Sequence, residues 1–258
     1  MSAHKRTPLE LALGMLYTKL PSSKLLDFYH VSLSGCLSSI VASKRLIPKR
    51  CAVFDANHLY FSYGAPHYRP TDHQTTDPKE LPVAFVLAYS IVEKMRYFFP
   101  FDTGAMAKGR YGRRYANPFR PLYDFSVTQN PDRLVSCFYE DNARYLRGQV
   151  VAQCPTNSAP IPLLHHFLSV NLSHKGIDQR QRTIECIADK PIRLSPSLLW
   201  VAYPDFQTLD IAKLWTSFRV GFDSYAYPTD ETSNPARLAE HIEIVAREWF
   251  RHRYEGPK

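Results

Sequence analysis

The stretch from Phe28 to Pro48, FYHVSLSGCLSSIVASKRLIP, joins a short strand pattern to a short helix pattern. Residues 26–31 (LDFYHV) are rich in aromatic and apolar side chains, which predicts a strand. In residues 37–42 (LSSIVA) the three apolar side chains fall on one side of a helix, and Pro48 ends the unit. A strand followed directly by a short helix indicates a mixed fold rather than an all-helical or all-β one.

This strand carries two polar side chains that suit a sugar ligand. His30 and Ser32 are two positions apart, so on a strand they face the same side. A ring nitrogen and a hydroxyl on one face can hold vicinal hydroxyls, such as those of a ribose. The alternative is a histidine that is hydrogen-bonded inside a core.

The next informative stretch, His58 to Arg69 (HLYFSYGAPHYR), has alternating aromatic residues followed by a turn that contains glycine. The alternation predicts a strand. Tyr60 or Tyr68 could stack on a flat heteroaromatic ring, and Arg69 could pair with a phosphate through two hydrogen bonds. The alternative is a buried aromatic strand with a surface arginine.

The rest of the chain predicts many short elements in a single domain of 258 residues. We expect an N-terminal helix at 8–20, a core at 25–205 and a C-terminal helix at 235–254. Residues 82–88 (PVAFVLA) form a continuous apolar run that is typical of a central strand. Further strands are expected at 134–139, 182–188 and 198–203. The predicted class is therefore α+β, with a mostly antiparallel sheet and flanking helices.

Composition narrows the class of protein. Hydrophobic residues make up 45% of the chain and charged residues 22%, as in globular proteins, and no apolar run is long enough to span a membrane. The five cysteines are odd in number and widely spaced, which predicts reduced thiols in a cytoplasmic protein. The spacing of His, Cys and acidic residues predicts no metal site, and no glycine-rich phosphate loop of the GxGxxG or Walker type occurs.

The net charge of +8 and the 16 tyrosines favour a polyanionic, aromatic partner such as nucleic acid. One loop concentrates both features. Cations alternate there with aromatic rings and no acid intervenes, a pattern that suits single-stranded nucleic acid. Its predicted contacts are Lys108, Arg110, Tyr111, Arg113, Arg114 and Tyr115. The alternative is a solvated basic loop.

A second motif lies just before this loop. Asp102, Thr103, Gly104 and Ala105 match the signature of aspartic proteases, in which two aspartates share a proton. The chain has no second copy of the motif, since Asp223 is followed by serine and tyrosine. The protease interpretation is therefore the weaker one.

In their order, the two stretches at Phe28–Pro48 and His58–Arg69 resemble the ADP-ribosyltransferase superfamily, and in particular its DarT-like, DNA-modifying branch. His30-Val31-Ser32 matches the His-x-Ser/Thr strand of that family, residues 37–46 its following helix, and residues 60–69 its aromatic strand and turn. The likeness covers about the first third of the chain. It implies a split antiparallel sheet and NAD as substrate.

The resemblance also implies roles for individual residues. His30, assisted by Ser32, would hold the ribose on the adenosine side of NAD, and Tyr60 or Tyr68 would stack on nicotinamide. Arg69 would meet the pyrophosphate. His30, Tyr60 and the catalytic glutamate would then converge in one cleft.

The family requires a glutamate on a later strand. Glu185 lies between Ile184 and Cys186 in a strand pattern, and a carboxyl in such an apolar setting calls for a reason. Its implied role is to stabilise the developing ribosyl cation and to orient the acceptor. Thr183 stands where many relatives carry Gln or Glu, which argues against an arginine-modifying subtype. Glu140, in a more polar turn, is the reserve candidate.

The predicted function is NAD-dependent ADP-ribosyl transfer to nucleic acid, DNA or RNA. By analogy with the family, the chain could serve as a toxin or a phage-defence effector with a protein antitoxin or regulator. Two alternatives stay open: a non-catalytic protein that binds single-stranded nucleic acid, and an NAD glycohydrolase, in which water replaces the acceptor.

Overall fold

A computed structural model describes residues 6–16, 25–64, 72–112, 117–128, 131–170, 179–218 and 221–255. The chain divides into two compact units. The first comprises Met1–Leu25, Cys51–Asp55 and Met95–Ile187, and the second comprises Leu26–Arg50, Ala56–Lys94 and Ala188–Lys258. The single-domain organisation stays a prediction.

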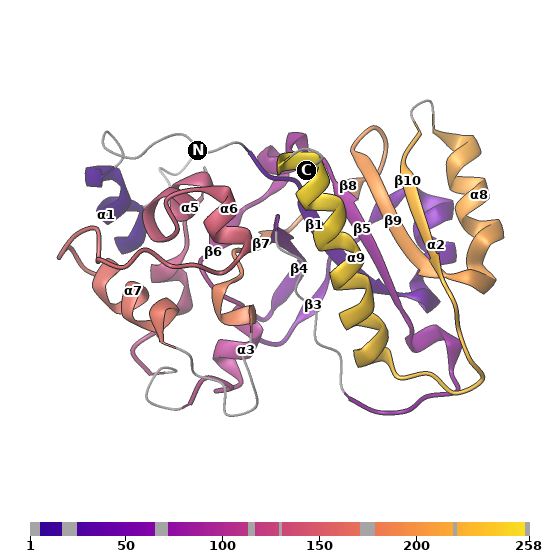
Figure 1. Cartoon of the computed structure of the whole chain (residues 1–258), viewed down its shortest axis with the longest axis horizontal. Coiled ribbons are helices and arrows are strands. Elements are labelled where there is room, and N and C mark those ends of the chain that lie inside the picture. The colour runs from indigo at the N-terminus through magenta and orange to yellow at the C-terminus, as the bar shows by residue number, and fades with distance from the viewer. Residues whose placement is uncertain are drawn as a thin grey trace. The chain divides into compact units, whose positions relative to one another are not determined.

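The second unit is built on a five-stranded run of sheet (Figure 1). Its strands, in spatial order, are β10 (Asp223–Tyr227), β9 (Leu198–Pro204), β5 (Pro82–Leu87), β1 (Phe28–Leu33) and β4 (Ala56–Tyr63). All neighbouring pairs are antiparallel except β10 and β9, which run parallel. Every residue of β5 is buried, as its continuous apolar sequence predicts. The predicted α+β class with a mostly antiparallel sheet is confirmed.

Helix α9 (Pro235–Glu255) packs against this sheet (Figure 1). Asn234 caps its first turn, since the Asn234 side-chain oxygen accepts hydrogen bonds from the next two backbone amides at 3.0 and 3.2 Å. The buried stripe of the helix runs through Ile242, Ala246 and Phe250, which join a core cluster with β1, β5 and β9. This helix is the longest of the described elements, and its apolar side anchors it to the strand that carries His30.

Shorter elements complete the second unit. Helix α2 (Leu37–Ser43) follows β1 as predicted and contacts α8 (Thr208–Ser217). The chain leaves α2 through Lys44, which has a positive φ of 54°. The remaining strands are β2 (Arg45–Leu46) and β8 (Ile192–Arg193), which pair with each other, and β3 (Lys49–Cys51), whose last residue is assigned to the first unit. The 3-10 helices of this unit are Ser34–Cys36, Pro78–Glu80, Tyr89–Lys94 and Asp205–Gln207.

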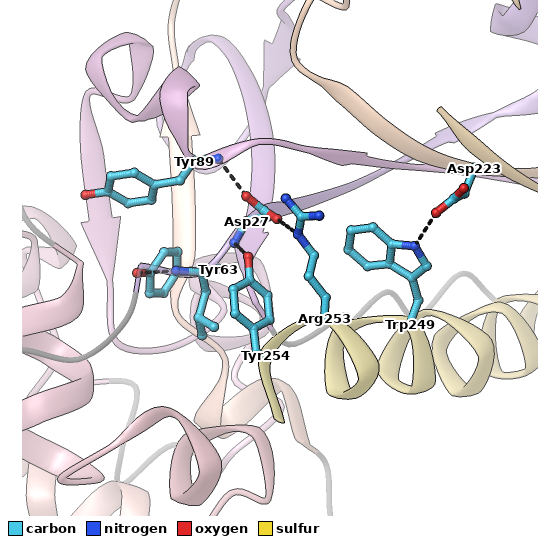
Figure 2. Close-up of polar contacts among 8 residues, drawn as sticks. Asp27, Tyr63, Tyr89, Asp223, Trp249, Arg253 and Tyr254 are labelled. Atoms are coloured by element: carbon cyan, nitrogen blue, oxygen red, sulfur yellow. Dashed lines mark hydrogen bonds and ion pairs between the residues drawn. The ribbon is translucent and has the colours of Figure 1, made fainter. Parts of the chain in front are cut away.

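A buried carboxylate fixes the start of β1, as Figure 2 shows. The Asp27 side chain accepts hydrogen bonds from the Tyr89 backbone amide and from Arg253 Nε, both at 2.8 Å. The Asp27 backbone amide donates to Tyr254 Oη at 2.9 Å, and its carbonyl accepts from the Gly64 amide at 2.9 Å. One residue thus ties together the entry to β1, the end of β4 and the last turn of α9.

The first unit consists mainly of helices (Figure 1). They are α1 (Pro8–Leu16), α3 (Thr103–Ala107), α5 (Asp132–Phe138), α6 (Asn142–Leu146) and α7 (Ile161–Ser169), with 3-10 helices at Leu122–Phe125 and Gln179–Arg182. Strand β6 (Tyr97–Phe99) pairs antiparallel with β7 (Glu185–Ala188). Aromatic rings fill its core: Phe101, Phe119, Phe125 and Phe167 contact one another at ring distances of 4.7–6.3 Å.

One sequence-based expectation in this unit is wrong, and a second is tested only in part. Residues 134–139 were expected to form a strand, but residues 132–138 form helix α5, which is wholly buried from Leu134 to Phe138. A helix that is covered on all sides has the same continuous apolar pattern as a buried strand, so the period alone does not separate the two. The N-terminal helix, expected at 8–20, is described as α1 up to Leu16, and residues 17–20 lie outside the described residues.

Within the described residues, no helix has both the length and the apolar character that a membrane crossing requires.

Candidate functional site

His30 lies in the middle of β1, opposite Phe85 of β5. The ring is half-buried and packs against Phe61 and Phe85, with ring centroids at 5.1 and 6.3 Å. Its Nδ1 lies 2.7 Å from the carbonyl oxygen of Tyr60 on β4. A carbonyl only accepts hydrogen bonds, so Nδ1 must carry the proton.

The surroundings of His30 keep the ring neutral. Burial is the main cause that lowers the pKa of His30 from 6.5 to about 4, the bond to the Tyr60 carbonyl raises it in part, and the nearby charge of Lys49 lowers it. With Nδ1 protonated and the ring neutral, Nε2 has a free lone pair and is a hydrogen-bond acceptor. Such a group suits the hydroxyl of a sugar better than an anionic phosphate.

This neutrality has a measurable consequence for stability. The pKa of His30 is lower in the folded chain than in the unfolded one, so His30 contributes full stability above pH 6.5 and loses it as the pH falls toward 4. Between pH 7 and pH 5 we expect the free energy of unfolding to fall by up to about 2 kcal/mol on account of this residue. Urea unfolding at both pH values should show a smaller fall in His30→Gln. An equal fall in both proteins would contradict a neutral His30.

Of the other residues predicted to bind NAD, the structure describes Ser32 and Tyr60. Ser32 and Tyr60 are both half-buried, and the Tyr60 ring meets the His58 ring edge-on at 6.1 Å. Tyr68 and Arg69 lie outside the described residues. Gly64, directly after β4, has a φ of 68°, and a Cβ there would clash with the Leu26 side chain, so this position requires glycine.

Glu185 belongs to the first unit, where it opens β7 opposite Phe99 of β6. Its neighbours Ile184 and Cys186 are fully buried, as the apolar sequence predicts, and Glu185 itself is half-buried. The carboxyl accepts two hydrogen bonds from Thr103: one from the hydroxyl at 2.5 Å and one from the backbone amide at 3.3 Å. Thr103 has no role in the sequence-based prediction, and only the fold brings it to Glu185.

Burial is the largest cause that raises the pKa of Glu185 well above its usual value, and the nearby Asp102 carboxylate is the second. The two hydrogen bonds from Thr103 act in the opposite direction, because they stabilise the ionised form. Cys51 adds a smaller upward effect. A buried carboxyl with a raised pKa and a carboxylate neighbour is typical of functional sites.

Glu140, the reserve acid, has a different environment. It is exposed at a positive φ of 73° and forms an ion pair with Arg144 at 2.7 Å. Such a surface pair contributes little energy and leaves the carboxylate in water. The structure gives Glu140 the polar turn that the sequence predicts and no feature of a catalytic acid.

The basic loop is described only in part. Lys108 and Arg110 are exposed, in keeping with contacts to phosphates, whereas Arg113, Arg114 and Tyr115 lie outside the described residues. For Tyr111, the prediction of a contact to nucleic acid is wrong. Only 5% of it is exposed, and its ring packs edge-on against Phe167 at 5.3 Å, so it belongs to the core of its unit and is not placed to stack on a base.

The Asp102-Thr103-Gly104 motif has a structural role that differs from that of a protease dyad. Asp102 caps helix α3, since its side chain accepts a hydrogen bond from the Ala105 amide at 2.7 Å. Within the described ranges, no three His, Cys, Asp or Glu side chains gather in the way that metal ligands do.

No family model and no curated protein matches the chain. Among solved structures, the chain is similar to DarT of Thermus sp. 2.9. The complex with NAD+ has 10% identity and a TM-score of 0.41, over 80% of this chain and 100% of that one. The complex with ADP-ribosylated ssDNA has 10% identity and a TM-score of 0.42, over 81% and 100%, and the carba-NAD+ complex has 11% and 0.39, over 79% and 99%.

Proposed function

We propose that this chain is an NAD-dependent ADP-ribosyltransferase that modifies nucleic acid. The observation that carries the proposal is the 2.7 Å hydrogen bond between His30 Nδ1 and the Tyr60 carbonyl. It links the two motifs that carry the family resemblance and fixes which ring nitrogen of His30 is offered to a ligand. The proposal also includes the split-sheet variant of the α+β fold.

The chemistry requires few groups. Nicotinamide leaves NAD as a neutral base, so the main task of the protein is to stabilise the positive charge that develops on the ribose. We assign this role to the Glu185 carboxylate, and the contact to the adenosine-side ribose to His30 Nε2. Ser32 assists His30, Tyr60 or Tyr68 stacks on nicotinamide, and Arg69 pairs with the pyrophosphate.

The test is incubation of the protein with NAD and, in separate reactions, single-stranded DNA, RNA and total protein. Free nicotinamide and the mass of the acceptor are both measured. We expect nicotinamide release together with one ADP-ribose added to nucleic acid. Nicotinamide release without a modified acceptor would identify a glycohydrolase. Binding of nucleic acid without nicotinamide release would identify a binding protein.

We expect the basic loop to hold the acceptor rather than NAD. Changing Arg110, Arg113 and Arg114 to alanine removes up to three phosphate contacts, and each is worth a slope of about 0.7 in the logarithmic salt dependence of single-strand binding. The variant should bind more weakly and with a flatter salt dependence, measured by fluorescence anisotropy between 50 and 300 mM salt. Affinity for NAD should stay the same.

Arg144→Ala serves as the control for this variant, because Arg144 is already paired with Glu140. It should leave the salt slope unchanged. If the triple variant loses affinity for NAD as much as for nucleic acid, the loop belongs to the NAD site or to the fold.

A role as a toxin or phage-defence effector, with a protein antitoxin or regulator as partner, is an extension of the proposal. Expression of the wild type in a bacterial host should then arrest growth, and the Glu185→Gln variant should not. Equal growth with both proteins would contradict the toxin role and would leave the proposed enzymatic activity to the nicotinamide assay.

A further inference from the structure

The Asp102-Thr103-Gly104 turn lies against Glu185 because of the strand pairing in the first unit. Phe99, the last residue of β6, is opposite Glu185, the first residue of β7. The chain continues from Phe99 into the turn and then into α3, and the Asp102 amide is held by the Arg180 carbonyl at 3.1 Å. Two segments 82 residues apart in sequence therefore meet at one carboxyl group.

The two hydrogen bonds from Thr103 end on the same oxygen of that carboxyl. Its hydroxyl and its backbone amide both donate to Glu185 Oε1, at 2.5 and 3.3 Å. Among the described residues, no group donates a hydrogen bond to the other oxygen, Oε2. A carboxyl group held at one oxygen has a defined plane, and its second oxygen is the one offered to a ligand.

We propose that Thr103 is the positioning residue of Glu185: its two hydrogen bonds hold Oε1 so that Oε2 faces the reacting ribose. This inference rests on the proposed function for the part that concerns the ribose. The hydrogen bonds from Thr103 to the Glu185 carboxyl involve only residues of the first unit. The motif that resembles a protease signature thereby acquires a role in ribosyl transfer.

The electrostatics of the turn explain why a threonine is needed there. Burial and the Asp102 carboxylate favour the protonated form of Glu185, and a protonated carboxyl would not stabilise a developing cation. Hydrogen bonds from Thr103 favour the ionised form and lower the pKa of Glu185. Asp102 also has a structural role, because its side chain caps α3 and thereby fixes the position of Thr103. Two cysteine thiols also interact with Glu185: Cys51 has a smaller effect on its pKa, and Glu185 in turn helps to raise the pKa of Cys186.

The first arm of the test measures the carboxyl directly. In protein labelled with [13C]glutamate, the side-chain signal of Glu185 is assigned by its loss in Glu185→Gln and is titrated with pH. Thr103→Val is nearly isosteric and removes the hydroxyl, so the pKa of Glu185 should rise. Thr103→Ser keeps the hydroxyl and should restore the wild-type value. Asp102→Asn keeps the helix cap but loses the charge, so it should lower the pKa of Glu185.

The second arm measures nicotinamide release from pH 5 to 9. In Thr103→Val we expect kcat at pH 7 to fall about tenfold, since a hydrogen bond to a charged group is lost, with little change in KM for NAD. The acidic limb of the kcat profile should move to higher pH, and Thr103→Ser should recover both values. In Asp102→Asn the limb should move to lower pH.

The chain offers a closely matched control. The Thr128 hydroxyl and amide both donate to Glu10 Oε1, each at 2.5 Å, so Thr128→Val removes the same kind of bond within the same unit. It should lower stability without altering the Glu185 titration or kcat. An unchanged Glu185 pKa in Thr103→Val, or a Thr128→Val effect of the same size, would overturn the inference. If the wild type releases no nicotinamide, the proposed function fails, and the titration still decides whether Thr103 controls Glu185.

Discussion

Replacing Glu185 by glutamine should lower the rate of nicotinamide release by about a hundred- to a thousand-fold while the affinity for NAD hardly changes. Glutamine keeps the size of the side chain and can still accept a hydrogen bond from Thr103. It has no negative charge to set against the positive charge that grows on the ribose in the transition state. A loss confined to the transition state appears in kcat and not in binding.

The Glu185→Gln variant should be folded at the assay pH. The pKa of Glu185 is raised in the folded state, so folding favours the protonated group. This contribution to stability is present below the usual glutamate pKa and is lost as the pH rises through the higher folded-state pKa. The neutral amide avoids that loss. Urea unfolding at pH 7.5 should therefore find the variant at least as stable as the wild type.

Two further variants test whether Glu185 or Glu140 is the catalytic acid and whether His30 binds NAD. Glu140→Gln changes an exposed glutamate that is paired with Arg144, and it should leave nicotinamide release unchanged. His30→Ala removes an acceptor for a ribose hydroxyl, so the apparent affinity for NAD should fall together with the rate. If Glu185→Gln turns over like the wild type and Glu140→Gln does not, Glu140 is the acid, and the assignment of Glu185 is wrong.

The second large effect concerns the anchor of β1. Asp27→Ala should lower the free energy of unfolding by about 2–3 kcal/mol, measured by urea denaturation at pH 7. The Asp27 side chain is only 5% exposed, and its loss leaves the Tyr89 amide without its acceptor. The Arg253 side chain is 44% exposed, so water can replace most of what its ion pair contributes. The unsatisfied amide therefore supplies most of the expected loss.

Asp223 of β10, which accepts a hydrogen bond from the same helix α9, provides the control. Its carboxylate accepts a hydrogen bond from Trp249 Nε1 at 3.0 Å, but the residue is exposed (Figure 2). Asp223→Ala should cost less than about 1 kcal/mol, because water takes the place of the lost acceptor. Asp27→Asn, which can still accept from the Tyr89 amide, should fall between the two. An Asp27→Ala variant no less stable than Asp223→Ala would show that the buried cluster does not anchor β1.

Local patterns in the sequence were sufficient to predict several helices and strands. The apolar spacing of residues 37–42 predicts α2, and Pro235 after Asn234 predicts the start of α9. The wholly apolar run of β5 predicts a central strand. In each case the signal lies within a few neighbouring residues, where the period of the backbone and the capping groups act directly. The apolar setting of Glu185 is a signal of the same kind.

Only the tertiary structure decided features that depend on distant parts of the chain. Residues 134–138 of α5 are all buried, so their continuous apolar pattern could not show that they form a helix rather than a strand. Tyr111 is a core residue because its ring packs against Phe167. Thr103 reaches Glu185 across 82 residues, and Arg253 reaches Asp27 across 226. Burial and long-range hydrogen bonds set which polar groups are ionised and held in place, and no local period records which distant side chain completes them.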